Sequence, residues 1–205
     1  MLGGSIARTA TEGELSVSTV LDYLLGRGTP FLVLPHPDAM TAEETAASHD
    51  VALEELVRTE IVVGRMGPSL MVVPAARYLR IELAQDALQD PGARLATHAE
   101  IRAIAPGCDL GGVPPLSLYL LAPMFVDPAV AELKQVVFTA GRRSVLVCME
   151  RAELFRDDPY VVVPLTAESH VPEDAVAPSR RPILRDEDLL PVHMVPPAND
   201  AIDVA

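Results

Sequence analysis

The sequence predicts an α+β fold built around a mixed β-sheet, and three observations lead to this class. Runs of β-branched and apolar residues, typical of strands, recur along the chain between amphipathic stretches typical of helices. The two kinds of segment do not alternate strictly, so a Rossmann-type parallel sheet is not expected. The 205 residues are 49% hydrophobic and 22% charged, which suits one globular domain with a sizeable core.

The first elements are predicted from helix spacing, capping residues and a short apolar run. Apolar residues three and four apart predict a surface helix that Ser16 caps and that ends between Gly26 and Gly28. The run 31–36 is typical of a short buried strand bounded by prolines. The T-x-x-E sequence at 41–44 is a capping box, so a second helix begins there.

The middle of the chain contains the clearest strand signals. Two β-branched runs, 56–64 and 69–75, are separated by "RMGP" and predict a hairpin. Helices are expected at 79–88 and at 97–107, where a second T-x-x-E capping box starts the helix. Further strands are expected at 119–127, 135–141 and 144–149, with short helices at 127–133 and 150–157.

The composition changes after about residue 156. The segment 157–205 is rich in proline and holds 10 acidic and 3 basic side chains, with little periodicity. Such a composition cannot build its own core. We therefore divide the chain into a domain over 1–156 and an extension over 157–205. The extension either lies along the domain as a tail or flexible arm, or docks a protein partner or a second copy of the chain.

The net charge of −13 excludes some partners. Non-specific binding to duplex DNA needs a broad cationic surface, which this chain lacks, although a local basic pocket for one nucleotide end remains open. Apolar runs are short and broken by proline, so no membrane span is expected. The N-terminus has no long apolar region typical of a secretory signal, and the two cysteines lack C-x-x-C spacing. We therefore expect a cytoplasmic protein.

Motifs for familiar catalytic chemistry are missing. The sequence has no G-x-S-x-G elbow and no Walker or G-x-G-x-x-G loop, and its five histidines do not fall at metal-binding spacing. We therefore expect no metal and no cofactor. Cys108 lies beside a glycine-rich loop and could act as a nucleophile, but no base is near it. A small buried thiol is the simpler interpretation.

Two stretches contain residues suited to binding. In "GGVPP", Gly111 and Gly112 allow positive φ and close approach of a ligand, while the two prolines stiffen the end of the loop. The loop is either a plain turn or part of a sieve-like pocket. In "TAGRRSV", Arg142 and Arg143 are either solvated charges on a hairpin turn or, with Arg58 and Arg77, a rim that faces phosphate. By itself, Arg58 is a solvated charge at a strand end.

The order of these segments resembles the YbaK / prolyl-tRNA-synthetase-associated domain family. The resemblance runs from about residue 17 to 156, through "PFLVLPHPDAMTAEETAA", "LEELVRTEIVV", "SLMVVPA", "RLATHAEI", "GCDLGGVPPLS", "MFVDPAVAEL" and "VVFTAGRRSVLVCM". Members of this family are trans-editing aminoacyl-tRNA deacylases that clear mischarged tRNA. The resemblance implies a mixed, barrel-like β-sheet flanked by helices.

The resemblance also implies a mechanism with little side-chain chemistry. A water molecule, assisted by the ribose hydroxyl of the substrate, attacks the aminoacyl ester, and backbone dipoles stabilise the oxyanion. The partner is then the 3′ end of a mischarged tRNA. The implied catalytic residues are Arg58 and three residues of the G-x-x-x-P loop, Gly111, Gly112 and Pro115. The implied substrate-binding residues are His36, Thr41, Thr59, Val113, Pro114, Gly141 and Arg142.

Two departures from the family pattern leave alternatives open. The family's Lys-Thr pair is Arg58-Thr59 here, and Ser117 stands where the family often has glycine. Arginine keeps the charge but is larger, fork-shaped and unable to act as a neutral base. The alternative function is a catalytically weakened protein that binds an aminoacyl or nucleotide ligand or a protein partner. A scaffold of chance similarity, with no nucleic-acid role, is a third hypothesis.

Overall fold

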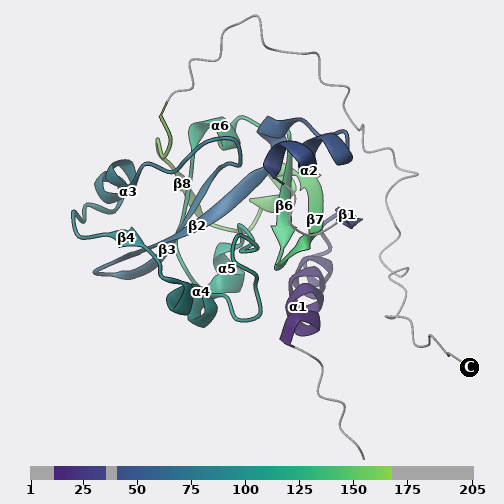
Figure 1. Cartoon of the computed structure of the whole chain (residues 1–205), viewed down its shortest axis with the longest axis horizontal. Helices are drawn as coiled ribbons and strands as arrows, with labels where there is room; N and C mark the ends of the chain where they lie inside the picture. Colours follow the sequence, from purple (N-terminus) through teal and green to yellow (C-terminus); the bar gives the residue numbers. More distant parts are fainter. Residues whose placement is uncertain (1–11, 36–40, 168–205) are drawn as a thin grey trace, which may run out of the picture.

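The computed structural model describes residues 12–35 and 41–167, which form helices packed around two β-sheets (Figure 1). The helices are α1 (Glu12–Gly26), α2 (Ala42–Ser48), η1 (Leu53–Glu55, a 3₁₀ turn), α3 (Ile81–Leu88), α4 (His98–Ile104), α5 (Ser117–Leu120), α6 (Pro128–Ala131) and α7 (Arg151–Leu154). The strands are β1 (Leu32–Pro35), β2 (Val57–Gly64), β3 (Gly67–Pro74), β4 (Arg94–Leu95), β5 (Met124–Val126), β6 (Gln135–Ala140), β7 (Arg142–Glu150) and β8 (Tyr160–Val162).

The two sheets give the fold its mixed character. The larger sheet has the order β4-β2-β3-β5-β8, in which β5 is parallel to both β3 and β8 and the other pairs are antiparallel. The smaller sheet, β1-β7-β6, is antiparallel throughout. A single bridge between Leu56 and Val137 brings the start of β2 beside β6. The predicted α+β fold with a mixed, barrel-like sheet is confirmed, although the described strands do not close into one barrel.

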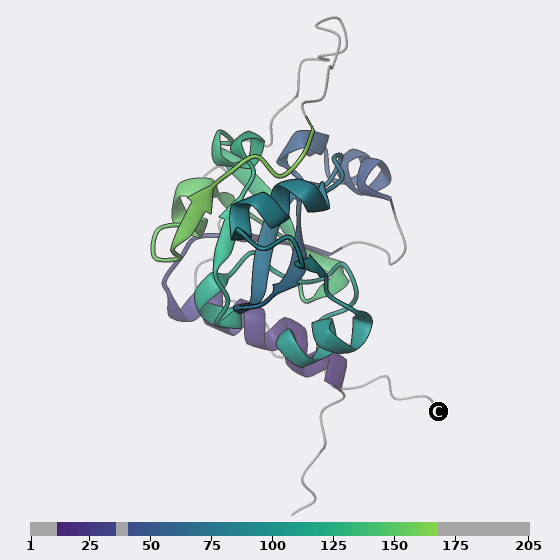
Figure 2. The ribbon, with the colours of Figure 1, turned by 90° about the vertical axis from the view of Figure 1, so that its left-hand side faces the viewer.

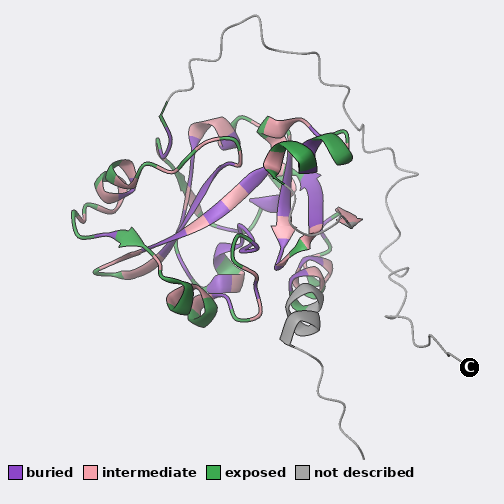
Figure 3. Cartoon of the chain, in the orientation of Figure 1, coloured by how far each residue is buried: buried purple, intermediate pink, exposed green. Residues whose placement is uncertain are grey.

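Helices cover the outside of the sheets. Figures 1 and 2 show α1 at one end of the strands and α2 and α6 at the other. In Figure 3 the strands are largely buried while the outer faces of α2, α3 and α4 are exposed, as expected for surface helices. None of the helices in the described part of the chain is long and apolar enough to cross a bilayer.

Several predicted starts and turns are found in the structure, and local sequence signals account for them. Both capping boxes form: Thr41 caps α2 and Thr97 caps α4, each by accepting a hydrogen bond from the backbone N–H three residues on. The predicted hairpin forms between β2 and β3 around a two-residue turn. The predicted cap at Ser16 is wrong, because α1 begins at Glu12 and Ser16 lies inside the helix.

The predicted strand at 119–127 is only partly correct. Its first residues belong to α5, and only Met124–Val126 pairs in the sheet. The carboxylate of Asp158 accepts hydrogen bonds from the Ser117 hydroxyl, at 2.9 Å, and from the Leu118 N–H, at 2.8 Å. These contacts hold the start of a helical turn, and Leu121 ends it with a left-handed backbone (φ 52°). A residue 40 positions away therefore overrides the local strand pattern.

The packed domain continues beyond residue 156, where the sequence suggested a boundary. Strand β8 adds an edge to the larger sheet. The buried carboxylate of Asp127 then accepts hydrogen bonds of 2.9–3.0 Å from the Leu165 N–H and from both the N–H and the hydroxyl of Thr166. The first part of the predicted extension thus belongs to the fold. Residues 168–205, the remainder of that extension, lie outside the described residues.

The main core supports the glycine-rich loop. Side chains from α1, both sheets and the loop form one buried cluster, in which Val20, Phe138 and Val113 are 0–4% exposed. Pro114 and Pro115 are buried as well. The loop is therefore anchored from beneath, and its outer residue, Gly111, is exposed.

Candidate active site

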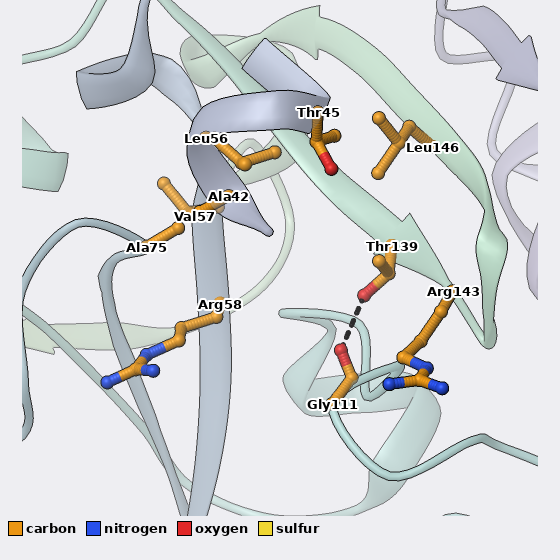
Figure 4. A pocket seen from close by; sticks show the side chains of 10 residues that line it. All are labelled: Ala42, Thr45, Leu56, Val57, Arg58, Ala75, Gly111, Thr139, Arg143 and Leu146. Carbon is orange, nitrogen blue, oxygen red and sulfur yellow. Dashed lines mark hydrogen bonds between the residues drawn. The ribbon is translucent and has the colours of Figure 1, made fainter. Parts of the chain in front are cut away.

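A pocket of about 150 Å³ lies where α2, the start of β2, the glycine-rich loop and the β6–β7 hairpin meet (Figure 4). Its lining is mainly apolar, with hydroxyl and guanidinium groups at the edge. The ten lining residues are Ala42, Thr45, Leu56, Val57, Arg58, Ala75, Gly111, Thr139, Arg143 and Leu146. The pocket thus combines Arg58 with the loop at Gly111, two features that lie far apart in the sequence.

One side of the pocket, which we call the backbone rim, consists of residues 109–115 and 139–143. The Asp109 N–H donates to the Gly141 carbonyl oxygen at 2.7 Å, and the Gly141 N–H donates to the Gly112 carbonyl oxygen at 2.9 Å. The Thr139 hydroxyl donates to the Gly111 carbonyl oxygen at 3.0 Å. The Arg143 N–H donates to Asp109 Oδ2 at 3.1 Å. The loop and the hairpin turn are therefore joined into one unit.

Glycine is required at the centre of the backbone rim. Gly111 and Gly141 have φ values of 82° and 87°, in the region that favours glycine. A Cβ atom on Gly112 would lie 2.4 Å from the Gly141 carbonyl oxygen. Such a contact is far closer than packed atoms allow, so Gly112 permits the close approach of the two chain segments.

The backbone rim has N–H groups to offer a ligand. The Gly112 N–H donates to the Asp109 carbonyl oxygen at 2.8 Å and is used within the loop. Among the described residues, no acceptor pairs with the N–H groups of Gly111 and Val113. An unpaired N–H beside a pocket can stabilise negative charge on a ligand oxygen. Of the two residues, Gly111 lines the pocket, whereas Val113 is buried and does not.

The opposite side, the side-chain rim, consists of Arg58, Glu60, Arg77 and Tyr78. One terminal nitrogen of Arg58 donates to the Arg77 carbonyl oxygen at 2.9 Å, and Nε lies 3.5 Å from Glu60 Oε1. The Arg58 guanidinium also lies over the Tyr78 ring, 5.4 Å from its centroid. In Figure 4 the Arg58 side chain extends away from Gly111 and Thr139. The cation is therefore held at the edge of the pocket.

A second cation reaches the pocket from the backbone rim. Arg143 lines it, and among the described residues its guanidinium has no ion pair. Both Arg142 and Arg143 were candidates for a phosphate-facing rim, and the resemblance implied substrate binding by Arg142, but Arg142 does not line the pocket. Successive residues of a strand point to opposite faces, so only one of two neighbouring arginines can face inward. The pocket is thus flanked by guanidinium groups on both sides.

The other residues named from the sequence support the pocket rather than line it. Thr41 is exposed and caps α2, whose Ala42 and Thr45 do line the pocket. Thr59 is buried, and its hydroxyl has no hydrogen-bond partner among the described residues. Val113, Pro114 and Pro115 are the buried end of the loop, and the Gly141 N–H donates to the Gly112 carbonyl oxygen. His36 lies outside the described residues.

Sequence reasoning missed several residues of this site, among them Thr45, Thr139 and Tyr78. Thr45 lies one turn into a helix whose cap was recognised, so helix geometry could have placed it. Thr139 precedes the glycine turn, and its hydroxyl meets the loop across 28 residues of sequence. No local pattern signals the position of Tyr78, which comes shortly after a strand end.

The polar side chains that line the pocket are two threonines and two arginines. Its ten lining residues include no histidine, cysteine, aspartate or glutamate. Burial raises the pKa of the Cys148 thiol to about 12, with a smaller contribution from the charge of Glu55. Cys108 is buried and is not a lining residue. Within the described ranges, no three histidine, cysteine, aspartate or glutamate side chains are grouped so that they could hold a metal ion.

The fold is a small α+β domain, and the polar groups around its pocket are main-chain N–H groups, hydroxyls and arginines. The sequence matches the model of the aminoacyl-tRNA editing domain over residues 36–156, which is more than half of the chain. The chain therefore belongs to the aminoacyl-tRNA editing domain family. No curated protein matches it.

Solved structures share this fold. A structure described as a candidate trans-editing enzyme for prolyl-tRNA synthetase is 24% identical, with a TM-score of 0.66, and the match covers 78% of this chain and 99% of that one. A hypothetical protein, APE2540, is 28% identical with a TM-score of 0.64, over 72% and 99% of the two chains. A scaffold used for computational epitope grafting is 23% identical with a TM-score of 0.67, over 74% and 97%.

Proposed function

We propose that this protein is a trans-acting aminoacyl-tRNA deacylase that hydrolyses the ester of mischarged tRNA in the pocket between the two rims. One observation carries the proposal: a loop fixed by main-chain hydrogen bonds presents Gly111, whose N–H has no acceptor among the described residues, to a small pocket. The family to which the chain belongs, the aminoacyl-tRNA editing domain, supports it.

In the proposed reaction, the main chain stabilises charge and the substrate supplies the base. A water oxygen attacks the ester carbonyl carbon, and the Gly111 N–H donates to the carbonyl oxygen as it becomes negative. The neighbouring ribose hydroxyl of the substrate takes part in transferring the proton from water to the leaving ribose oxygen. The bond between the carbonyl carbon and that oxygen then breaks, giving free amino acid and uncharged tRNA.

The rest of the glycine-rich loop has a positioning role in this proposal. Gly112 allows the loop to approach Gly141, and the buried Pro114 and Pro115 limit its movement. Preorganised donors need no rearrangement when charge develops, which is the main source of their effect. The loop therefore contributes through its rigidity as well as its N–H groups.

The two arginines are suited to the anionic end of the RNA. Guanidinium groups pair with phosphate through two parallel hydrogen bonds. Arg58 and Arg143 flank the pocket from its two sides, so a phosphate next to the terminal ribose can contact one of them. Because the chain as a whole carries a charge of −13, attraction to RNA is confined to this local site.

The pocket favours a small amino-acid side chain. At about 150 Å³, with Ala42, Val57 and Ala75 in its lining, it has little room for an aromatic group. The Thr45 and Thr139 hydroxyls add a polar edge. Alanine, cysteine, serine and threonine are therefore the candidates, and discrimination among them by size alone is about 10- to 200-fold per methylene group.

A second function, binding without catalysis, is favoured by the contacts of Arg58. Its guanidinium is held by the Arg77 carbonyl and by Glu60, so it must leave these partners or accept phosphate on its exposed side. Under this alternative, the protein binds an aminoacyl or nucleotide ligand, or another protein through the extension beyond residue 167, and leaves the ester intact.

The test is deacylation of a panel of tRNAs charged with alanine, cysteine, serine or threonine, measured as loss of the labelled ester. We expect hydrolysis of at least one of them well above the rate in buffer. Arg58→Ala should lower kcat/KM by about 10²- to 10³-fold, as removal of one electrostatic donor does elsewhere. The matched control is Arg102→Ala, because Arg102 is an exposed arginine on α4, outside the pocket.

The same assay separates the two functions. Ester loss equal to that in buffer across the panel, with tRNA still bound, would replace the deacylase by the binding protein. Arg58→Lys should retain most of the activity if only the positive charge is needed. An inactive Lys variant would show that the fork of the guanidinium has become essential.

A further inference from the structure

Tyr78 is the one strongly exposed aromatic side chain of this protein. The chain has four tyrosines, four phenylalanines and no tryptophan, and all eight aromatic residues lie in the described ranges. Seven of them are buried or half-buried, whereas Tyr78 is 82% exposed. The ring of Tyr78 is therefore accessible from solvent.

The main chain on both sides of Tyr78 is anchored. On one side, the Arg77 N–H donates to the Pro74 carbonyl oxygen at 3.0 Å and closes a turn after β3. On the other side, Leu79 forms a β-bridge with Thr166, and the Arg80 N–H donates to the Leu165 carbonyl oxygen at 2.9 Å. The ring therefore projects from a fixed position.

The ring lies against the pocket's own cation. The Arg58 guanidinium sits 5.4 Å from the ring centroid, and Arg58 lines the pocket. Ala75, three residues before Tyr78, lines it too. With one face of the ring toward Arg58 and the side chain 82% exposed, a flat group can approach from solvent.

We propose that Tyr78 is a stacking platform for a nucleobase of the RNA 3′ end, and that it positions the terminal nucleotides while the acyl group occupies the pocket. This inference rests on the proposed function, because it assigns a binding role next to the same pocket. Stacking on an aromatic side chain tolerates any base, since every base has a π-face. The platform thus adds affinity without reading sequence, while the pocket selects the acyl group.

A fluorescence titration tests the platform directly. Tyr78→Trp introduces the only tryptophan of the chain, and stacking of a base on an indole ring quenches its fluorescence. The probe is an uncharged acceptor-stem RNA hairpin ending in CCA, compared with the same hairpin lacking its terminal base. We expect saturable quenching by the intact hairpin and at least about fivefold weaker binding of the abasic one.

The matched control places tryptophan elsewhere on the surface. Leu121→Trp is suitable because Leu121 is 88% exposed and is not a lining residue of the pocket. Quenching at both positions would indicate non-specific contact and overturn the proposal. Equal binding of the intact and abasic hairpins to the Tyr78→Trp variant would overturn it as well.

Deacylation kinetics supply a second measurement. Tyr78→Ala should raise KM about 5- to 100-fold, the range expected for loss of one stacked base, with kcat changed less than about threefold. Tyr78→Phe keeps the π-face and should stay within about threefold of the parent KM. Tyr78→Leu keeps apolar area without the π-face, so it should resemble Tyr78→Ala. Equal KM values for the Phe and Leu variants would mean simple apolar docking and would overturn stacking.

Failure of this inference can be told apart from failure of the proposed function. If the parent protein hydrolyses no aminoacyl-tRNA, the deacylase is lost, but the titration with uncharged RNA still decides whether Tyr78 binds a base. If the parent is active and Tyr78→Ala has an unchanged KM, only the platform is overturned. Tyr78 is exposed, so none of these variants removes a core contact.

Discussion

The two rims of the pocket are held together by different kinds of contact. In the backbone rim, residues 109–115 and 139–143 are joined mainly by main-chain hydrogen bonds of 2.7–3.1 Å, and its central glycine, Gly112, is packed against Gly141. In the side-chain rim, Arg58 and Glu60 have side chains 30% and 35% exposed, and Tyr78 is more exposed still. The first rim is held by main-chain contacts of the fold, whereas the second is held by contacts of side chains.

This difference gives the two rims different expected roles in folding and in binding. Ion pairs near the surface contribute at most about 1 kcal/mol, so little free energy is lost if Arg58 leaves the half-buried pair with Glu60 for a ligand. The backbone rim can change only if a strand or a loop moves. Substitutions at the backbone rim should therefore affect folding and the chemical step together, while those at the side-chain rim should affect binding and leave the fold intact.

The largest expected effect is the protection of the buried Cys148 thiol, which reports whether strands β6 and β7 next to the backbone rim open. Cys148 lies on β7, opposite Val137 on β6, and is 2% exposed. Burial raises the pKa of its thiol from 9.0 to about 12, so at pH 8 its thiolate is about a thousandfold scarcer than that of an ordinary cysteine. In the Cys108→Ala variant, Cys148 should react with a thiol reagent at least about a thousandfold more slowly than after unfolding in urea.

The same shift fixes the sign of a pH dependence. The folded state holds the thiol proton up to about pH 12, whereas the unfolded state releases it near pH 9. The contribution of Cys148 to stability is therefore complete below pH 9 and is lost as the pH rises above it. Urea unfolding at about pH 8 and about pH 10 should show a smaller loss for Cys148→Ala than for the parent. Rapid labelling of the native protein would mean that β7 opens and that the backbone rim is not rigid.

The next effect is expected at Gly112. In Gly112→Ala the new Cβ meets the Gly141 carbonyl oxygen, so the loop and the turn must separate. The free energy of unfolding should fall by about 1–3 kcal/mol, as for other overpacked sites. The proposed deacylation should fall about 100-fold, comparable to loss of an oxyanion donor. Urea denaturation and single-turnover kinetics measure the two effects.

Gly26→Ala is the control for this substitution. Gly26 ends α1, and a Cβ atom there would meet nothing within 4 Å. This variant should be as stable and as active as the parent. Equal stability of the two alanine variants would show that the loop can move aside, which contradicts a fixed backbone rim.

A smaller effect is expected at Thr139. Thr139→Val removes the hydroxyl that donates to the Gly111 carbonyl oxygen and leaves the shape of the side chain nearly unchanged. Loss of this hydrogen bond should lower the free energy of unfolding by about 1 kcal/mol and reduce kcat more than it changes KM. Thr139→Ser keeps the donor and should restore kcat. A Ser variant as slow as the Val variant would assign the effect to packing.

The smallest effect is expected on the side-chain rim, at Glu60. Glu60→Gln removes the negative charge beside Arg58 Nε while keeping a similar shape. The free energy of unfolding should change by less than about 0.5 kcal/mol, because the pair lies near the surface, with about a third of each side chain in water. Affinity for uncharged acceptor-stem RNA should rise about twofold at low salt, since a carboxylate no longer opposes the phosphates.

Glu132→Gln controls for net charge alone, because Glu132 is exposed at the end of α6 and does not line the pocket. Equal gains in the two variants would assign the effect to overall charge. A loss of stability at Glu60 larger than that at Thr139 would reverse the comparison between the rims.

The sequence was most informative where structure is set by neighbours along the chain. The capping boxes at Thr41 and Thr97 and the β2–β3 hairpin were predicted because caps and turns depend on residues three or four apart. Helix α5 was not predicted, because its start depends on the distant carboxylate of Asp158. The continuation of the sheet into β8 was missed for the same reason, since it depends on pairing with the distant β5.

The candidate site was predictable to a lesser degree. The resemblance implied roles for Arg58, Gly111 and Thr41, and of these the pocket lining includes Arg58 and Gly111 but not Thr41. The direction of the Arg58 side chain was not predictable, since it depends on the Arg77 carbonyl and the Tyr78 ring on the next loop. The choice of Arg143 over Arg142 depends on strand register, which composition does not reveal.

The buried carboxylate of Asp127 has a consequence for the order in which this protein can fold during synthesis. Its partners, Leu165 and Thr166, are made 38 and 39 residues later. Strand β8 runs parallel to β5, so no hairpin can bring the two together early. Until residue 166 leaves the ribosome, β5 lies at an open sheet edge and Asp127 lacks these partners. The domain thus completes its sheet only after translation has passed well beyond residue 156, where the match to the family ends.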